Sequence, residues 1–175
     1  AESLSLGPHG QSFRNCLMSI HAAVAKIRAG ELRAELDPVR TMRNEDRARW
    51  DEFARSNDKA TFYHMSGWRH ILENVLGHKT HYLLVERQGD IEGILPLGHV
   101  RSRLFGNALI SVPFLVYGGP VARTPEARQA LVDAACKLAD SLGVDYLELR
   151  NLEPLTDWPT KTQYVTFRKP IVPDP

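Results

Sequence analysis

The chain has 175 residues, of which 43% are apolar and 25% are charged, enough for one compact domain that buries roughly 70% of its unfolded surface. Its 22 basic residues nearly cancel its 21 acidic residues, which excludes the global field that concentrates DNA or an anionic membrane surface. The two cysteines, Cys16 and Cys136, are too few for a disulfide framework and fit a reducing compartment. One bridge between them remains an open alternative.

The apolar stretches of the sequence are short. The longest, residues 108–117, is interrupted by Ser111 and Pro113 and falls well short of the ~20 residues that a spanning helix requires. The amino-terminal residues lack the cationic start and apolar block of a secretory signal. We therefore expect a cytoplasmic protein without a membrane span.

Residues 1–38 read as a leader that precedes one domain at residues 39–175. Within the leader, apolar residues of the segment 16–27 recur at helical intervals, and Gly30 follows as a stop signal. This amphipathic helix is expected to cover an apolar groove or to contact a partner. A leader that is not native to the protein is the alternative.

The first elements of the domain are predicted from residues 39–60. A short strand is expected at 39–42, and Asn44 is the expected N-cap of a helix with two acidic residues in its first turn. Trp50 and Phe53 fall on the face of this helix that we expect to meet the core.

A second helix is predicted after an extended segment at 61–64. Ser66 is its expected cap and Gly77 its expected end. Its apolar face is expected to carry Trp68, Ile71, Leu72 and Val75.

The clearest hairpin joins residues 80–87 to residues 91–100 through a turn around Gly89. Its two arms are rich in β-branched and aromatic residues, so antiparallel pairing is expected. A further strand is predicted at 109–116, where Pro113 should lie at an edge or force a bulge.

The strongest helix prediction covers residues 124–142, followed by the stop signal Gly143. A short buried strand is expected at 144–150 and a last strand at 164–168. Together these elements predict an α/β protein with a mixed, mostly antiparallel sheet and helices on both faces.

Motif absences remove several functions. The sequence has no phosphate-binding Gly-x-x-x-x-Gly-Lys loop, no Gly-x-Gly-x-x-Gly after a strand, no His-Glu-x-x-His and no Gly-x-Ser-x-Gly elbow. His70, His78 and His81 lie near one helix end, but no acidic residue or cysteine joins them at ligand spacing. We expect no metal site and favour solvent-facing histidines.

His64 and two arginines are candidate functional residues. His64 closes a segment just before a helix, where it could act as general base or substrate ligand; a hydrogen-bonded structural histidine is the alternative. Arg101 and Arg103 alternate on one strand, so they could form a cationic ridge for a phosphate or carboxylate. A solvated strand edge is the alternative there.

Two further motifs could border a ligand. In Tyr117-Gly118-Gly119 the glycines would allow positive φ angles and a close approach of the backbone to a ligand, although a plain tight turn is simpler. Glu148 and Arg150 should point to one face of a strand. We favour a substrate cleft over purely structural partners for these two charges, because strand ends commonly border binding crevices.

Several segments, taken in order, carry a family resemblance. They are Ala60-Thr61-Phe62-Tyr63-His64 with Gly67-Trp68, Gly93-Ile94-Leu95-Pro96-Leu97, Arg101-Ser102-Arg103-Leu104-Phe105-Gly106, Ser111-Val112-Pro113-Phe114, Tyr117-Gly118-Gly119-Pro120 and Glu148-Leu149-Arg150. Over about residues 39–175 the chain resembles FemAB-like proteins associated with exosortase/PEP-CTERM systems. The resemblance implies the GNAT fold of acyl-CoA N-acyltransferases, and it covers only the first of the two similar halves of such proteins.

The resemblance implies an N-acyltransferase that moves an aminoacyl or acyl group to an amine of a cell-envelope, peptidoglycan or exopolysaccharide precursor. This chain would supply the acceptor-binding half and could be inactive alone. His64, or Glu148 through a water, is the expected proton acceptor. The expected substrate-binding residues are Trp68, Arg101, Arg103, Tyr117, Gly118, Gly119, Arg150 and Asn151.

Cofactor and partner expectations follow from the same resemblance. We expect no tightly bound cofactor and no metal, and either aminoacyl-tRNA or acyl-CoA as donor. The helix predicted at 124–142 is not preceded by the Gln/Arg-x-x-Gly-x-Gly/Ala loop by which typical GNAT enzymes hold the pyrophosphate of acyl-CoA. Expected partners are a small-molecule, lipid-linked or nucleotide-linked precursor, tRNA as donor, and a second copy or second half; DNA is not expected. The alternative function is a non-catalytic module that docks a precursor or a second polypeptide.

Overall fold

The computed structural model describes residues 35–102, 106–152 and 159–160. The chain divides into two compact units, residues 1–36 and residues 37–175, and every helix and strand described below belongs to the second. Three expectations lie outside the described residues: the helix at 16–27, the strand at 164–168 and the position of Arg103.

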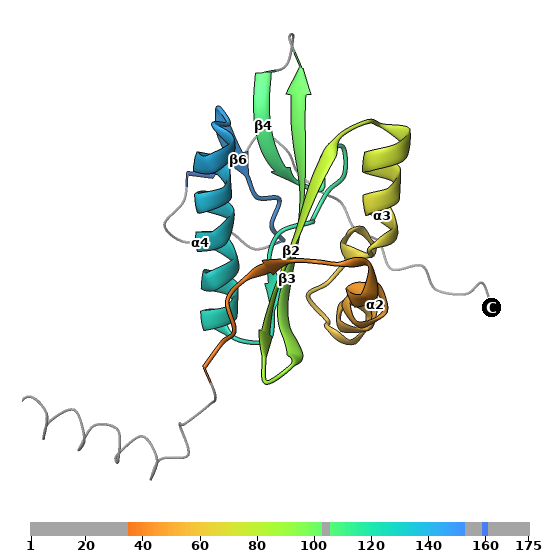
Figure 1. The fold of residues 1–175 in the computed structure, drawn as a ribbon, viewed down its shortest axis with the longest axis vertical. Coiled ribbons are helices and arrows are strands. Elements are labelled where there is room, and N and C mark those ends of the chain that lie inside the picture. The colour runs from red at the N-terminus through yellow and green to blue at the C-terminus, as the bar shows by residue number, and fades with distance from the viewer. Residues whose placement is uncertain (1–34, 103–105, 153–158, 161–175) are drawn as a thin grey trace, which may run out of the picture. The chain divides into compact units, whose positions relative to one another are not determined.

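One sheet organises the second unit (Figure 1). Its strand order is β1-β2-β3-β4-β6, and β5 pairs with β3 off this path. All pairs are antiparallel except β4 with β6, which is parallel. The strands are β1 (Arg40–Thr41), β2 (Lys79–Arg87), β3 (Asp90–Ser102), β4 (Gly106–Ser111), β5 (Val121–Ala122) and β6 (Tyr146–Glu148). The predicted first strand and hairpin are confirmed.

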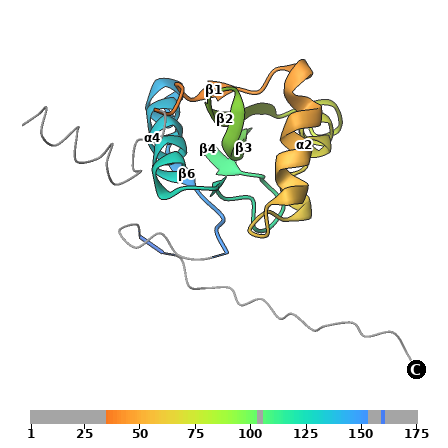
Figure 2. The same ribbon diagram turned by 90° about the horizontal axis from the view of Figure 1, so that it is seen from below.

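Helices cover both faces of the sheet, as predicted. Figure 2 shows α4 on one side of the strands and α2 on the other. The helical elements are the 3-10 turns η1 (Asn44–Asp46) and η2 (Phe62–His64), the α-helices α2 (Arg47–Ser56), α3 (Gly67–His70) and α4 (Pro125–Leu142), and the π-helical turn η3 (Ile71–Val75).

The core lies on both faces of β2 and β3. Trp50 and Phe53 of α2 are 0% and 3% exposed, as predicted, and the Trp50 ring packs against Tyr82 of β2 at a centroid distance of 5.2 Å. Toward α4, Gly93 of β3 allows a close approach, because a Cβ there would lie 2.9 Å from Cδ1 of Leu131. Burying aromatic and aliphatic side chains in these two layers supplies the main stabilisation of the domain.

The helix α4 begins and ends as the sequence predicts. The hydroxyl of Thr124 accepts a hydrogen bond from the Ala127 N–H at 3.2 Å, and Gly143 adopts a left-handed φ of 58° just after the last turn. Leu131 and Ala135 of its apolar stripe are both 0% exposed. The stripe therefore anchors α4 along the sheet.

Two local predictions in the first part of the domain are wrong. Asn44 is not an N-cap: it starts the turn η1, and the Asp46 carboxylate accepts the Arg43 N–H at 2.7 Å instead. Residues 61–64 are not extended, because the Thr61 hydroxyl accepts the N–H of Tyr63 at 3.3 Å and starts the turn η2. In both places a side chain near the turn accepts a hydrogen bond from a backbone N–H. At Thr61 this favours a helical turn over the expected extended segment.

The second helix departs from the predicted amphipathic pattern. Ser66 precedes α3, but its hydroxyl donates to Asp51 at 2.9 Å rather than capping the helix. Leu72 is 1% exposed, whereas Ile71 and Val75 are 37% and 70% exposed. The π-helical turn explains the difference, since i to i+5 hydrogen bonds rotate side chains off the stripe of an ordinary α-helix.

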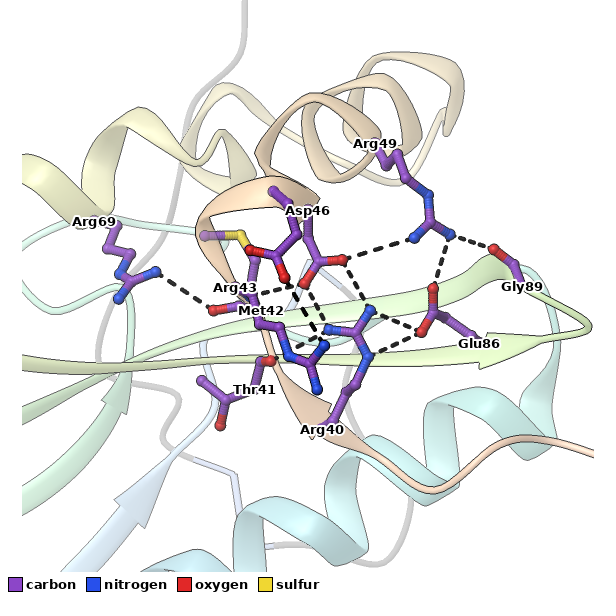
Figure 3. Close-up of polar contacts among 10 residues, drawn as sticks. Arg40, Thr41, Met42, Arg43, Asp46, Arg49, Arg69, Glu86 and Gly89 are labelled. Atoms are coloured by element: carbon purple, nitrogen blue, oxygen red, sulfur yellow. Dashed lines mark hydrogen bonds and ion pairs between the residues drawn. The ribbon is translucent and has the colours of Figure 1, made fainter.

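An ionic network joins β1, the start of α2 and the β2–β3 hairpin (Figure 3). Arg40 donates to both oxygens of Asp46, at 2.6 and 2.8 Å, and to Glu86 at 2.9 Å. Arg49 bridges Glu86, at 2.8 Å, and the Gly89 carbonyl in the turn. The paired charges tie β1 and the start of α2 to the β2–β3 hairpin, whose Glu86 lies 37 or more positions later in the sequence.

Asp46 is the most buried member of this network, with 4% of its surface exposed. Its hydrogen bonds from Arg40 lower the pKa of the Asp46 carboxyl to about 2, against the opposing effect of burial. The same contacts raise the pKa of Arg40. The folded state therefore favours the ionised carboxylate of Asp46, and protonation of this group opposes folding.

We predict that Asp46→Asn lowers the free energy of unfolding at pH 7 by about 2 kcal/mol. Because the folded pKa lies below the unfolded value of about 4, the contribution of Asp46 is complete above pH 4 and is lost as the pH falls toward 2. Urea unfolding of both proteins between pH 7 and pH 2.5 measures this. The curves should converge in acid, and exposed Asp58→Asn serves as the control. A constant difference across this range would contradict the role of Asp46.

Candidate functional site

A loop leaves the sheet between β4 and β5. On β3, Leu97 pairs with Ser111 and Ile94 pairs with Val121, so residues 112–120 are an excursion from one nearly continuous edge. The strand predicted at 109–116 therefore ends at Ser111, and Pro113 lies in the loop beyond the strand rather than at a strand edge or in a bulge. We call this segment loop 112–120.

The backbone of loop 112–120 is strained. Three non-glycine residues have positive φ angles: Val112 at 46°, Phe114 at 69° and Tyr117 at 57°. Such conformations cost about 1–3 kcal/mol each and persist only where the surroundings impose them. They gather at sites that bind ligands or do chemistry, which directs attention to what holds this loop.

The turn η2 holds the loop from one side. The Thr61 hydroxyl donates to the Tyr117 carbonyl at 3.0 Å. The His64 imidazole bonds the Gly119 carbonyl through Nε2 at 2.9 Å, and its Nδ1 accepts the Thr61 N–H at 2.9 Å. Because Nδ1 is an acceptor, the proton of the neutral ring lies on Nε2.

His64 is 1% exposed, and burial lowers the pKa of its imidazole below the ordinary value. Both ring nitrogens are engaged by backbone groups, so neither is available to a substrate proton in this conformation. The geometry fits the structural alternative for His64, which is to position loop 112–120, better than the expected role as general base.

The strand β6 holds the loop from the other side. Its parallel pairing with β4 ends at Ile110 and Glu148. Beyond this point the Arg150 N–H donates to the Ser111 hydroxyl at 2.7 Å, and the Arg150 carbonyl accepts the Gly119 N–H at 3.0 Å. Beyond Glu148 the chain therefore bonds to the Ser111 side chain and to the loop, and no longer to the β4 backbone. The strands β4 and β6 separate at their carboxyl ends.

Glu148 and Arg150 point to the same face, as predicted. Their side chains pair at 2.7 Å between Glu148 Oε1 and Arg150 Nε, and Nη1 of Arg150 donates to the Leu115 carbonyl in the loop. The two side chains are 34% and 29% exposed. The charge of Arg150 is thus balanced within the protein, while the Glu148 carboxylate still meets water. The strand expected to be buried over 144–150 is three residues long, ends at Glu148 and is only partly buried, so Arg150 lies just beyond it.

The paired glycines are required by space rather than by φ. Neither Gly118 nor Gly119 has a positive φ, so that part of the expectation is wrong. A Cβ on Gly118 would lie 2.3 Å from Cγ2 of Val112, and a Cβ on Gly119 would lie 1.9 Å from Oδ1 of Asn151. The backbone here approaches other protein groups more closely than any side chain permits.

Two polar groups beside Gly119 lack a hydrogen-bond partner in the part of the chain that the structure describes. Oδ1 of Asn151 is buried without a hydrogen bond. Among the described residues, no hydrogen bond engages the N–H of Gly118, which is itself a buried residue. Buried orphans of this kind are rare and call for an explanation such as a ligand or a water. One is a donor and one an acceptor, and they flank the same residue.

Two other predicted residues, Trp68 and Arg101, have their described contacts elsewhere. Trp68 donates from Nε1 to the Phe62 carbonyl at 3.1 Å and packs edge-on against the Phe62 ring. Arg101 is exposed near the end of β3 and pairs in register with Asn107, well beyond the rung that precedes the loop. The structure therefore does not bring Arg101 to loop 112–120.

Sequence reasoning missed Thr61 and Ser111. Thr61 precedes a short turn as an N-cap does, and this was a readable signal. Ser111 was visible only as a polar interruption of an apolar run. Its role depends on Arg150, which lies 39 residues later in the chain, so no local pattern could reveal it.

The histidines near the end of the second helix form no metal centre with other ligands. Within the ranges that the structure describes, no group of three His, Cys, Asp or Glu side chains could hold a metal ion. His70 is exposed, whereas His78 stacks on Phe114 at 5.4 Å and His81 is half-buried. None of the described helices is long and apolar enough to cross a membrane.

Comparisons with known proteins establish the fold. No family model matches the chain, and no curated protein matches it. Among solved structures, AAC(6')-Iy in complex with the bisubstrate analogue CoA-S-monomethyl-acetylneamine has a TM-score of 0.51 at 12% identity, covering 79% of this chain and 100% of that one. The domain therefore has the GNAT acetyltransferase fold, and the predicted fold class is confirmed.

Two other similar structures are acetyltransferases. A ribosomal-protein-alanine N-acetyltransferase from Brucella melitensis biovar Abortus 2308 has a TM-score of 0.46 at 14% identity, covering 75% of this chain and 99% of that one. A GNAT family acetyltransferase from Staphylococcus aureus subsp. aureus USA300_TCH1516 has a TM-score of 0.49 at 12% identity, covering 76% and 98%. The FemAB-like branch within this fold stays a prediction.

We predict that Gly119→Ala lowers the free energy of unfolding by about 1–3 kcal/mol, because the added methyl group overlaps Asn151 Oδ1 and must displace it. Gly67→Ala is the matched control, since a Cβ at Gly67 meets nothing within 4 Å, and it should leave stability equal or higher. Thermal and urea unfolding measure both. Equal stability of the Gly119→Ala and Gly67→Ala variants would contradict the close approach.

We further predict that His64 makes stability depend on pH near neutrality. Because burial lowers its pKa, the unfolded chain binds the proton more readily, and the contribution of neutral His64 is complete well above pH 6.5 and declines as the pH falls below it. The difference in unfolding free energy between wild type and His64→Asn should therefore shrink from pH 8 to pH 5.5. The exposed His70→Asn is the control, and a difference that grows in acid would refute the assignment.

Proposed function

We propose that this domain catalyses N-acyl transfer at loop 112–120, where β4 and β6 part. Parallel strands commonly border binding sites at their carboxyl ends. The loop follows the end of β4 and is hydrogen-bonded to Arg150, just beyond the end of β6. Its backbone is strained and held by contacts from η2 and β6. Such fixed geometry suits a reaction in which the protein mainly aligns reactants and stabilises developing charge.

The observation that carries the proposal is the pair of unpartnered groups beside Gly119. The Gly118 N–H is a donor, and Asn151 Oδ1 is an acceptor. An amine attacking an acyl carbonyl develops negative charge on oxygen and carries N–H groups on nitrogen. The Gly118 N–H complements the negative charge on oxygen, and Asn151 Oδ1 complements the N–H groups of the amine. The two unpartnered groups therefore match both reacting atoms.

The reaction then needs no covalent enzyme intermediate. The amine nitrogen forms the C–N bond while the Gly118 N–H stabilises the oxyanion and Asn151 Oδ1 orients the amine. The ester C–O or thioester C–S bond breaks, and its electron pair leaves with oxygen or sulfur. The amine proton passes through a water to the Glu148 carboxylate, which is 34% exposed, and from there to the leaving group or to solvent.

The other residues act by position. Arg150 holds Glu148 and the Leu115 carbonyl, and His64 holds Gly119, so both are positioning residues. The acceptor that we propose, an amine of a peptidoglycan or exopolysaccharide precursor, follows from the FemAB-like resemblance. An activated ester or thioester is the donor class that the chemistry requires.

The second candidate function is docking of a precursor or a polypeptide without catalysis. Exposed apolar side chains favour it: Val75 is 70% exposed, Leu76 46% and Phe114 63%. His78 follows Leu76 in the chain and stacks on Phe114, which brings the loop and the end of η3 together. Binding of a precursor without amide formation from any donor would identify this function.

We predict that the full chain forms amides from an acyl thioester or aminoacyl ester and an amine acceptor, followed by mass spectrometry over a panel of acceptors that includes UDP-linked muropeptides. Asn151→Ala should lower kcat at least about fivefold, because a lost hydrogen bond to a reacting group costs about 1–3 kcal/mol. Asn74→Ala, at an exposed position on η3, is the matched control. Equal rates for wild type and Asn151→Ala would overturn the site, and no amide from any donor would overturn the function.

A further inference from the structure

The first turn of α4 decides whether this domain can grip a phosphate-bearing donor. Helix N-termini bind phosphates through exposed N–H groups and a positive dipole end. The fold implies acyl-CoA as a donor, whose diphosphate would need such a site. At 18 residues, α4 is long enough to offer one, and it directly follows the β5 edge of the sheet.

The residues of this turn do not fit a diphosphate. Pro125 occupies the first turn and brings no N–H. The Ala127 N–H is taken by the Thr124 hydroxyl at 3.2 Å, and Thr124 is 6% exposed. Glu126 adds a carboxylate to the same turn. Anion binding is opposed in three ways: Pro125 lacks an N–H, the Ala127 N–H is already bonded, and the Glu126 carboxylate repels negative charge.

The segment that leads into α4 offers no phosphate loop either. Residues 121–128 contain no glycine, and Val121 and Ala122 are paired with β3. The Arg123 N–H donates to the Glu92 carbonyl at 2.8 Å, and its guanidinium lies 5.3 Å from the centroid of Phe53, a residue of α2. Since α2 and α4 cover opposite faces of the sheet (Figure 2), this cation is directed away from α4.

Arg128 is the basic side chain that could still hold a phosphate near this turn. Its Nε is buried and has no hydrogen-bond partner among the described residues. Its own N–H is used in the helix, donating to the Thr124 carbonyl at 3.1 Å. One guanidinium beside a carboxylate makes a poor cradle for a diphosphate, but it supplies a direct test.

We infer that this domain does not hold its acyl donor by phosphate groups at α4 and instead recognises the acyl arm alone at loop 112–120. This inference rests on the proposed function. The donor class is then an acyl ester or thioester whose nucleotide portion contributes nothing to binding by this domain. Acyl-CoA, where it reacts, does so through its thioester arm.

The test compares CoA with pantetheine, which carries the same thiol arm without the nucleotide. Binding to the full chain is measured by calorimetry, and turnover with S-acetyl-CoA and S-acetyl-pantetheine. We expect dissociation constants and kcat/KM values equal within about threefold. Arg128→Gln should leave the CoA affinity unchanged. CoA binding more than tenfold tighter than pantetheine, or weakened more than threefold by Arg128→Gln, would overturn the inference.

A gain-of-binding variant completes the design. Pro125→Gly with Glu126→Gln restores an N–H and removes the opposing charge, so CoA affinity should rise at least threefold while pantetheine affinity stays constant. Glu126→Gln alone is the milder variant if the double change prevents folding, which circular dichroism reports. No gain in either folded variant would overturn this account of the turn. Equal CoA and pantetheine binding without transfer from any donor would refute the proposed function and with it the donor assignment, whereas transfer together with tighter CoA binding would overturn the inference alone.

Discussion

The hydrogen bonds that clamp Gly119 organise the whole site. Its carbonyl is held by His64 and its N–H by the Arg150 carbonyl, so a turn near residue 60 and a strand near residue 150 meet on one residue of the loop. Together with the contacts of Thr61 and Arg150 to other loop carbonyls, this clamp holds Val112, Phe114 and Tyr117 in left-handed conformations. The separation of β4 from β6 thus belongs to the same feature as the strained loop. That feature is stabilised by η2 on one side and by the chain beyond β6 on the other.

The domain treats its buried polar groups in two different ways. In the network beside the hairpin, the Asp46 carboxylate receives hydrogen bonds from Arg40 and from the Arg43 N–H, which leaves a charged group fully satisfied. Beside Gly119, by contrast, Asn151 Oδ1 and the Gly118 N–H are unsatisfied among the described residues. Hydrogen-bonded polar groups stabilise a fold, whereas a buried polar group without a partner destabilises the folded state until a ligand or a water binds it. This contrast separates the structural half of the domain from the half that we assign to chemistry.

Elements with strong local signals were predictable. The hairpin follows from β-branched arms around Gly89, and α4 follows from its cap, its apolar stripe and Gly143. Predictions resting on weaker signals were wrong where side chains compete for the backbone, as Thr61 does in turning an expected strand into a 3-10 turn. The role of the paired glycines was misassigned for a related reason, because the atoms that crowd them, on Val112 and Asn151, come from elsewhere in the fold.

The amino-acid pattern alone determined most of the strands, the long helix, the mixed sheet and the placement of Glu148 and Arg150 on one face, since each depends on periodicity or on residues a few positions apart. Only the tertiary structure decided what those parts do together. It buried His64 against Gly119, turned Arg150 toward Ser111 and the loop, and placed Arg101 far from both. These outcomes join residues separated by 35 or more positions, and such contacts depend on how the elements pack rather than on any local signal.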